Sequence, residues 1–280
     1  QPFAISSAFS LFHISKVARE KMKVVLTGDG GDEVFAGYGL KHEPYKVPVL
    51  IQNTPAFLRP FASTMAKLLS NEGLHRHYKM SIAEKFLSRN RQVSEHDAMS
   101  LIPVEKRKEV DTTRLKDYLE DCFKRVKKFS WIHQLLFADM STFLKSEMLY
   151  KVDRMTMANG LEARVPFLDH ELVEMSFGAP DFFLRDKGVG KLPLRHWVNT
   201  HYPELGFRPK TGFNAPLKRL FNDDLATRFK VLDLLKIALN SSVTERGSVQ
   251  EVYNSFEIKN RLDVNLVMAV ACLGGWIKGR

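Results

Sequence analysis

The chain has 280 residues, enough for one large domain or two small ones, and a formal net charge of +10. Hydrophobic residues make up 44% of it and charged residues 26%, as is ordinary for a soluble globular protein. No apolar run reaches the roughly 18 residues of a membrane span. The two cysteines, Cys122 and Cys272, lack the spacing of a zinc site. These features argue against a membrane-spanning protein and a disulfide scaffold, and they favour a reducing, cytoplasmic location.

The positive charge permits binding to nucleic acid, to an anionic membrane surface or to a phosphate-bearing ligand. Lysines and arginines are scattered, with short clusters at residues 106–108 and 124–128. The sequence contains no basic stripe with interleaved aromatics and no RNP motif. We therefore expect neither a nucleic-acid nor a membrane partner, and nucleic-acid binding stays a distant alternative.

The first predicted elements are a helix and a strand. Residues 7–21 carry apolar side chains at helical spacing, among them Leu11, Ile14 and Val17, which predicts a helix with a buried face. Residues 22–27 (MKVVLT) form a valine-rich run that ends at glycines. This pattern predicts a parallel strand buried on both faces, and no other run predicts a strand of this kind.

Helical periodicity dominates from residue 55 onward, and residues 264–277 predict a buried helix. One strand among many helices would make an unusual complete α/β domain, because a parallel strand needs neighbours on both sides. A mostly helical fold with an incidental strand is one explanation. The pattern favours another, in which the neighbouring strands belong to an upstream segment. The chain begins Gln1-Pro2-Phe3, with no methionine and no signal peptide, so we expect a fragment of a longer protein.

A first candidate site follows the predicted strand, at residues 27–38 (TGDGGDEVFAGY). Glycines between a strand and a helix let backbone N–H groups approach a phosphate. The same turn carries the carboxylates of Asp29, Asp32 and Glu33, which repel a phosphate unless a cation such as Mg²⁺ lies between them. The motif therefore predicts a magnesium–phosphate site. A glycine turn in which Asp32 caps the next helix is the structural alternative.

A second motif covers residues 151–169 (KVDRMTMANGLEARVPFLD). It ends a helical stretch, turns at Asn159-Gly160 and begins a new helix at Asp169. Four of its charged residues could form a buried ion network: Asp153, Arg154, Glu162 and Arg164. On the residues alone, a structural role is at least as well supported as a catalytic one.

The third motif is a rigid loop at residues 208–216 (RPKTGFNAP), which presents Lys210. A fixed ammonium group near a departing pyrophosphate would stabilise its developing negative charge. On the loop alone, a solvated surface lysine is the better supported explanation.

The three motifs, in this order, resemble the signatures of the asparagine synthase family. The chain supplies TGDGGDEVFAGY, LYKVDRMTMANGLEARVPFLDHELVE and RPKTGFNAP, and its closing helix at residues 265–278 is also similar. The resemblance covers nearly the whole chain. It implies an α/β fold that is part of an adenine-nucleotide alpha-hydrolase-like (ATP-pyrophosphatase) domain, mostly helical in this fragment. Residues 1–280 would be one synthetase domain, incomplete at its N-terminal side.

The resemblance also implies an activity, with ATP and Mg²⁺ as cofactors. Aspartate would be activated as its AMP ester and amidated to asparagine, with ammonia supplied from glutamine by a glutaminase domain of the same full-length chain. A homodimer is compatible with this assignment. Carried over residue by residue, the resemblance implies nucleotide contacts at Thr27, Gly28, Gly30 and Gly31, a role in the acyl-adenylate step for Asp29, a Mg²⁺–pyrophosphate ligand in Asp32, and stabilisation of pyrophosphate formation by Lys210.

Two departures from the family pattern limit this assignment. No SGG-D-S phosphate-binding loop occurs in the chain, so we expect this polypeptide alone to be inactive or nearly so. Ile5 stands where many relatives carry an acid, which leaves the acceptor carboxylate open. The alternatives are amidation of another carboxylate, as in surface-polysaccharide or β-lactam chemistry, and a non-catalytic remnant that binds a nucleotide or a partner.

Overall fold

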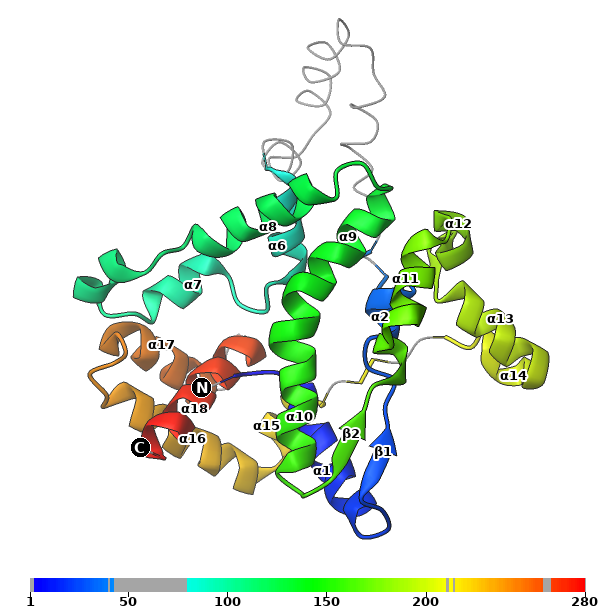
Figure 1. Ribbon diagram of the computed structural model, residues 1–280. Coiled ribbons are helices and arrows are strands. Elements are labelled where there is room, and N and C mark those ends of the chain that lie inside the picture. The colour runs from blue at the N-terminus through cyan, green and yellow to red at the C-terminus, as the bar shows by residue number, and fades with distance from the viewer. Residues whose placement is uncertain are drawn as a thin grey trace, which may run out of the picture.

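The computed structural model describes residues 3–39, 41–42, 80–209, 212–213, 215–258 and 263–279. Helices dominate these residues, and a short pair of strands lies at the edge of the molecule beside α10 (Figure 1). The helices are α1 (Ser7–Arg19), α2 (Gly31–Val34), α6 (Ile82–Asn90), α7 (Glu95–Ser100), η2 (Val104–Glu109), α8 (Arg114–Arg125), α9 (Trp131–Asp139), η3 (Met140–Met148), α10 (Leu149–Met157), η4 (Pro166–Leu168), α11 (His170–Gly178), α12 (Asp181–Leu184), α13 (Leu192–His201), α14 (Pro203–Gly206), α15 (Leu217–Asp223), α16 (Leu225–Leu239), α17 (Arg246–Glu257) and α18 (Val264–Lys278).

Strands β1 (Val24–Leu26) and β2 (Glu162–Arg164) pair in parallel, with Val25 opposite Ala163. The strand predicted at residues 22–27 is confirmed at its centre. Its neighbour β2 comes from the second motif, where no strand was predicted. The further neighbours expected from an upstream segment stay a prediction. Burial on both faces is wrong, since the Leu26 side chain is 75% exposed. The physical reason is that, among the described residues, β1 has β2 as its only neighbour.

Helix α1 confirms the helix predicted at residues 7–21, but its apolar residues are not all buried. Ile14 and Val17 are exposed, whereas the small polar Ser15 is buried and donates a 2.6 Å hydrogen bond to the Leu11 carbonyl. The helix packs against α10, which covers only one side of it. The predicted buried face is therefore wrong at Ile14 and Val17, because burial depends on which neighbour a helix has.

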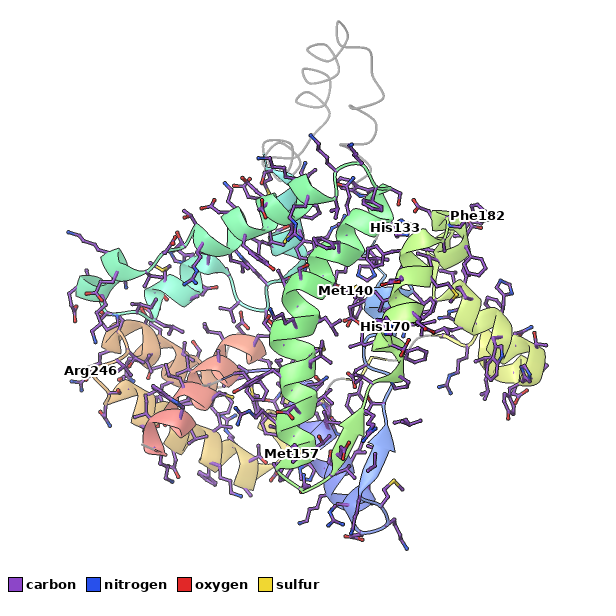
Figure 2. All side chains as sticks on the ribbon, viewed as in Figure 1. His133, Met140, Met157, His170, Phe182 and Arg246 are labelled. Carbon is purple, nitrogen blue, oxygen red and sulfur yellow. The ribbon has the colours of Figure 1, made fainter. Side chains whose placement is uncertain are left out.

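One long helical segment, α9–η3–α10, crosses the centre of the molecule from Trp131 to Met157 (Figure 1). In Figure 2, His133 lies near its first turn and Met157 marks its last. Its middle part, η3, is a π-helix, a form often found at functional sites. The segment ends at Met157, and in the turn that follows, Gly160 has a φ of +67° and leads the chain into β2.

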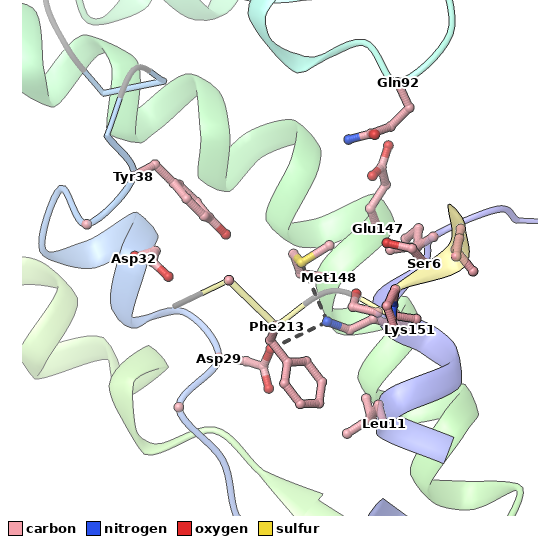
Figure 3. A pocket seen from close by; sticks show the side chains of 18 of the residues that line it. Ser6, Leu11, Asp29, Asp32, Tyr38, Gln92, Glu147, Met148, Lys151 and Phe213 are labelled. Carbon is pink, nitrogen blue, oxygen red and sulfur yellow. Dashed lines mark hydrogen bonds and ion pairs between the residues drawn. The ribbon is translucent and has the colours of Figure 1, made fainter. Parts of the chain in front are cut away.

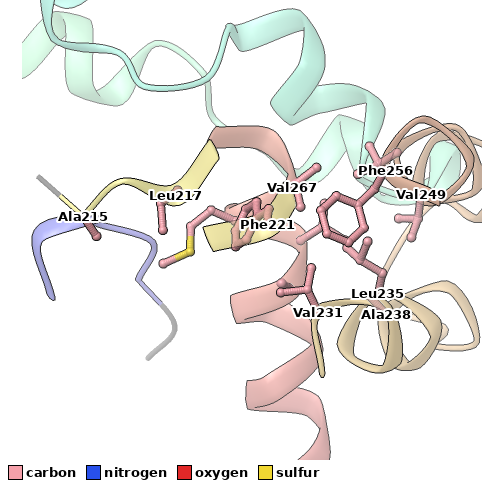
Figure 4. Close-up of a cluster of buried hydrophobic side chains, with 13 residues drawn as sticks. Ala215, Leu217, Phe221, Val231, Leu235, Ala238, Val249, Phe256 and Val267 are labelled. Carbon is pink, nitrogen blue, oxygen red and sulfur yellow. The ribbon is translucent and has the colours of Figure 1, made fainter. Parts of the chain in front are cut away.

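The largest hydrophobic core lies among α15, α16, α17 and α18 (Figure 4). The rings of Phe221 and Phe256 meet edge to face, with centroids 5.5 Å apart. Helix α18 confirms the buried helix predicted at residues 264–277, and Val267 and Val270 are almost fully buried. No described helix has both the length and the apolar character needed to cross a bilayer.

A second, two-stranded sheet is the hairpin of β3 (Arg185–Asp186) and β4 (Val189–Gly190). Its turn residues, Lys187 and Gly188, both have positive φ, as a tight hairpin turn requires. The buried guanidinium of Arg185 donates hydrogen bonds of 3.0–3.2 Å to the carbonyls of three residues that follow α2, namely Ala36, Tyr38 and Gly39. The hairpin therefore fixes the end of the first motif.

Candidate active site

A cavity of about 1930 Å³ lies at the carboxyl end of β1 (Figure 3). This end of a parallel sheet is the usual place for ligands in α/β folds. All three sequence motifs contribute to its lining: Thr27, Gly28, Asp29 and Asp32 from the first, Lys151 from the second, and Arg208, Pro209, Gly212 and Phe213 from the third. The structure thus brings together three segments that are far apart in sequence.

Thr27 directly follows β1, at its carboxyl end. Its backbone N–H donates a 2.8 Å hydrogen bond to the Arg164 carbonyl, which continues the ladder of β1 and β2. Thr27 lines the cavity, whereas its hydroxyl oxygen is buried and has no hydrogen-bond partner among the described residues.

Gly30 and Gly31 of the first motif pack closely against neighbouring side chains. Both are buried, Gly30 against the Leu168 side chain and Gly31 against the Phe167 ring. Neither is among the residues that line the cavity, whereas Gly28 is. The nucleotide contacts predicted for Gly30 and Gly31 stay predictions, and the structure adds a reason of its own for having glycine at both positions.

We expect Gly30→Ala to destabilise the fold, because Gly30 has a φ of +87° and an added Cβ would lie 2.4 Å from a Leu168 methyl. The combined strain and overpacking should cost about 2–3 kcal/mol. Gly28→Ala is the matched control, since nothing lies within 4 Å of a Cβ there. Thermal unfolding of both variants measures the difference, and equal midpoints would contradict the packing role of Gly30.

Lys151 is a site residue that the sequence did not single out. It lies on α10, is 5% exposed and lines the cavity. Its Nζ lies 4.0 Å from Asp29 Oδ1 and 3.7 Å from the sulfur of Met148 (dashed in Figure 3). Burial lowers the pKa of Lys151, against the opposing charges of Asp29 and Glu33. Lys151 is the first residue of the second motif, and this position was the only hint in the sequence. The spacing of the motif did not show that its side chain would face Asp29.

Asp32 lies inside the single turn of α2 and does not cap it, because Gly30 is the N-cap residue. Its Oδ1 lies 3.2 Å from Nζ of Lys191, the second cation that sequence reasoning missed. Lys191 follows the β3–β4 hairpin, and its backbone N–H donates a 2.7 Å hydrogen bond to the Phe35 carbonyl. The hairpin therefore places Lys191 beside Asp32, the carboxylate that is predicted to bind Mg²⁺.

Behind these acids lies a buried charged cluster. The Tyr38 hydroxyl donates a 2.8 Å hydrogen bond to Glu33, and burial raises the pKa of both groups. Fully buried Asp139 lies 2.5 Å from Lys41 Nζ and 2.9 Å from His42 Nε2. Burial lowers the pKa of Lys41 and of His42, which opposes a positive charge on either side chain. The cluster ties the chain after α2 to the last residue of α9.

The ion network predicted for the second motif is wrong. Arg164 pairs with Glu162 at 2.8 Å, but both side chains are more than half exposed. Asp153 and Arg154 are exposed as well, and Arg154 lies over the Tyr150 ring. The four charges sit on outward positions of α10 and β2, so water screens them and they form no buried network.

The chemistry of the lining side chains fits a magnesium ion that is shared with a phosphate. Asp29 and Asp32 both line the cavity. Within the described ranges, no three His, Cys, Asp or Glu side chains gather closely enough to hold a metal by themselves. Mg²⁺ commonly uses one or two carboxylates and takes its other ligands from phosphates and water. Two carboxylates are therefore a sufficient protein contribution.

Lys210 lies outside the described residues, so its predicted approach to Asp29 and Asp32 stays a prediction. Its sequence neighbours Pro209 and Gly212 both line the cavity. Phe213 also lines the cavity (Figure 3). The loop that carries Lys210 thus borders the same space as the first motif.

Comparisons with known proteins agree with the motifs. A family model described as asparagine synthase matches residues 1–265. The chain is 26% identical over 229 residues to glutamine-hydrolyzing asparagine synthetase 1 of Bacillus subtilis, covering 80% of this chain and 35% of that protein. It is 26% identical over 226 residues to a putative glutamine-hydrolyzing asparagine synthetase of Mycobacterium tuberculosis, covering 78% and 33%. A 65-residue stretch is 42% identical to a putative asparagine synthetase of Methanocaldococcus jannaschii, covering 23% and 12%. The chain spans about a third of the length of the first two.

Proposed function

This chain belongs to the asparagine synthase family, and we propose that the full-length protein that carries it uses ATP to convert a carboxylic acid into its amide. Aspartate is the proposed acceptor and glutamine the proposed source of ammonia. The observation that carries the proposal is the convergence of three distant motifs on one cavity at the carboxyl end of a parallel strand pair. Thr27, which directly follows β1, and Gly28 both line this cavity.

The proposed reaction needs carboxylates to hold Mg²⁺ and cations to stabilise the departing pyrophosphate, and the cavity contains both. Thr27 and Gly28 would contact the nucleotide, and Asp29 and Asp32 would hold the Mg²⁺ ion of ATP, which offsets phosphate charge when it is bound. Lys151 and Lys191 already face these carboxylates. Their ammonium groups would stabilise the negative charge that develops as pyrophosphate leaves. Lys210 would add to this from the third motif.

The test is formation of AMP and pyrophosphate by the purified full-length protein. With ATP, Mg²⁺, aspartate and either glutamine or ammonium, we expect one AMP for each asparagine formed. Asp32→Asn should lower the rate by about 100-fold or more, because one fixed charge in the phosphate site is lost. The matched control is Asp233→Asn, at an exposed position on α16.

Two results would contradict the proposal. One is the absence of AMP with aspartate and with a panel of other carboxylic acids. The other is an Asp32→Asn protein that forms AMP as fast as the Asp233→Asn control. AMP formation with a different acid but not with aspartate would keep the amidation chemistry and replace the acceptor.

A further inference from the structure

The lining of the cavity includes a carboxylate, Glu147, that the proposed chemistry does not use. Phe143, Glu147 and Lys151 recur every four residues along η3 and α10, and all three line the cavity. Figure 3 shows Lys151 extending toward Asp29, whereas Glu147 points the other way, toward Gln92. The helical segment thus presents a cation to one end of the cavity and an anion to the other.

Glu147 is partly buried and has no hydrogen bond or ion pair with any described residue. The two lysines of its surroundings are already engaged. Lys41 Nζ lies 2.5 Å from Asp139 and 3.4 Å from the centroid of the Phe143 ring, and Lys151 faces Asp29. Burial raises the pKa of Glu147, against the opposing positive charge of Lys41.

A partly buried carboxylate without a partner is unfavourable unless a ligand supplies a cation or hydrogen-bond donors. Glu147 is accessible to such a ligand, because it lines both the main cavity and an adjoining cavity of about 390 Å³. Gln92 also lines both, has no hydrogen bond with a described residue and carries an amide that can donate or accept.

On the basis of the proposed function, we infer that Glu147 binds the ammonium group of the acceptor, which is therefore an amino acid and not a carboxylic acid without an amine. The charges orient such a molecule. Its reacting carboxylate lies toward the phosphate end, where Lys151 and Lys191 stand, and its ammonium lies toward Glu147. Gln92 completes the same subsite with a neutral hydrogen bond.

The test compares aspartate with succinate, its analogue without the ammonium group, in AMP formation by the full-length protein. The wild-type protein should prefer aspartate. Glu147→Gln keeps the shape of the side chain and removes its charge. It should raise KM for aspartate by about 10-fold or more, change kcat less, and leave KM for succinate unchanged. Glu147→Asp should keep part of the preference. Glu174→Gln, on the exposed side of α11, is the matched control and should behave as wild type.

The outcomes separate this inference from the proposed function. If the wild-type protein forms no AMP with any carboxylic acid, the proposed function fails and the inference fails with it. If the wild type uses succinate as well as aspartate, the inference is overturned whatever the variants do. If the wild type prefers aspartate and folded Glu147→Gln keeps that preference, the inference is overturned while the proposed function stands. Thermal unfolding midpoints show whether the variants are folded.

Discussion

Gly274→Ala should destabilise the C-terminal helical core by about 3 kcal/mol, the upper end of the usual cost of overpacking. Gly274 lies on α18 where this helix crosses α16, and an added Cβ would lie 2.0 Å from the carbonyl oxygen and 2.9 Å from the carbonyl carbon of Leu234. These are backbone atoms of a helix, so no side-chain rotation can make room. The two helices would have to move apart, which would loosen the contacts of Val267 and Val270.

The adjacent glycine provides the matched control. A Cβ at Gly275 would lie 3.8 Å from a Leu234 methyl, an ordinary van der Waals distance. Gly275→Ala should therefore stabilise the helix by about 0.5–1 kcal/mol, since glycine is a poor helix former. Thermal unfolding of the full-length protein, followed by the transition of this domain, gives both values. Equal shifts for the two variants would show that α16 and α18 do not approach as closely as the structure places them.

The core around α18 was predictable because its signal is local. Residues 264–277 are apolar over a length that suits a helix and not a membrane span, and the structure buries them. The strand β1 was predictable for the same reason. Its partner β2 was not, because three residues of sequence Glu-Ala-Arg carry no apolar run. Only the preceding turn at Gly160 and the position of β1 beside it make this segment a strand.

The candidate site shows the same division between local and distant information. Asp29 and Asp32 stand out in the sequence because three carboxylates share one glycine-rich turn. Lys191 does not stand out, because it reaches Asp32 through a hairpin about 160 residues further along the chain. Such pairings depend on tertiary packing, which no periodicity records. The failed ion network of the second motif has the same origin, since the sequence did not show which faces of α10 and β2 point to water.

Lys151→Met should lower AMP formation by the full-length protein by about 100-fold or more, because it removes a fixed positive charge from the proposed phosphate site. Methionine keeps most of the aliphatic length, so the cavity wall should stay filled. Lys145→Met is the matched control, since Lys145 is exposed on the same helical segment and lines neither cavity. Its rate should equal that of the wild type.

The stability of the same variant separates a functional lysine from a structural one. Burial lowers the pKa of Lys151 in the folded state, so the unfolded chain holds this proton more tightly. The resulting penalty on folding is fully present below the folded pKa and disappears as the pH rises toward the unfolded value. Lys151→Met should therefore be at least as stable as the wild type at neutral pH, and its advantage should shrink at alkaline pH. If Lys151→Met is inactive but no less stable than the wild type, the charge of Lys151 serves ligand binding or catalysis. If activity and stability fall together, Lys151 is a structural partner of Asp29.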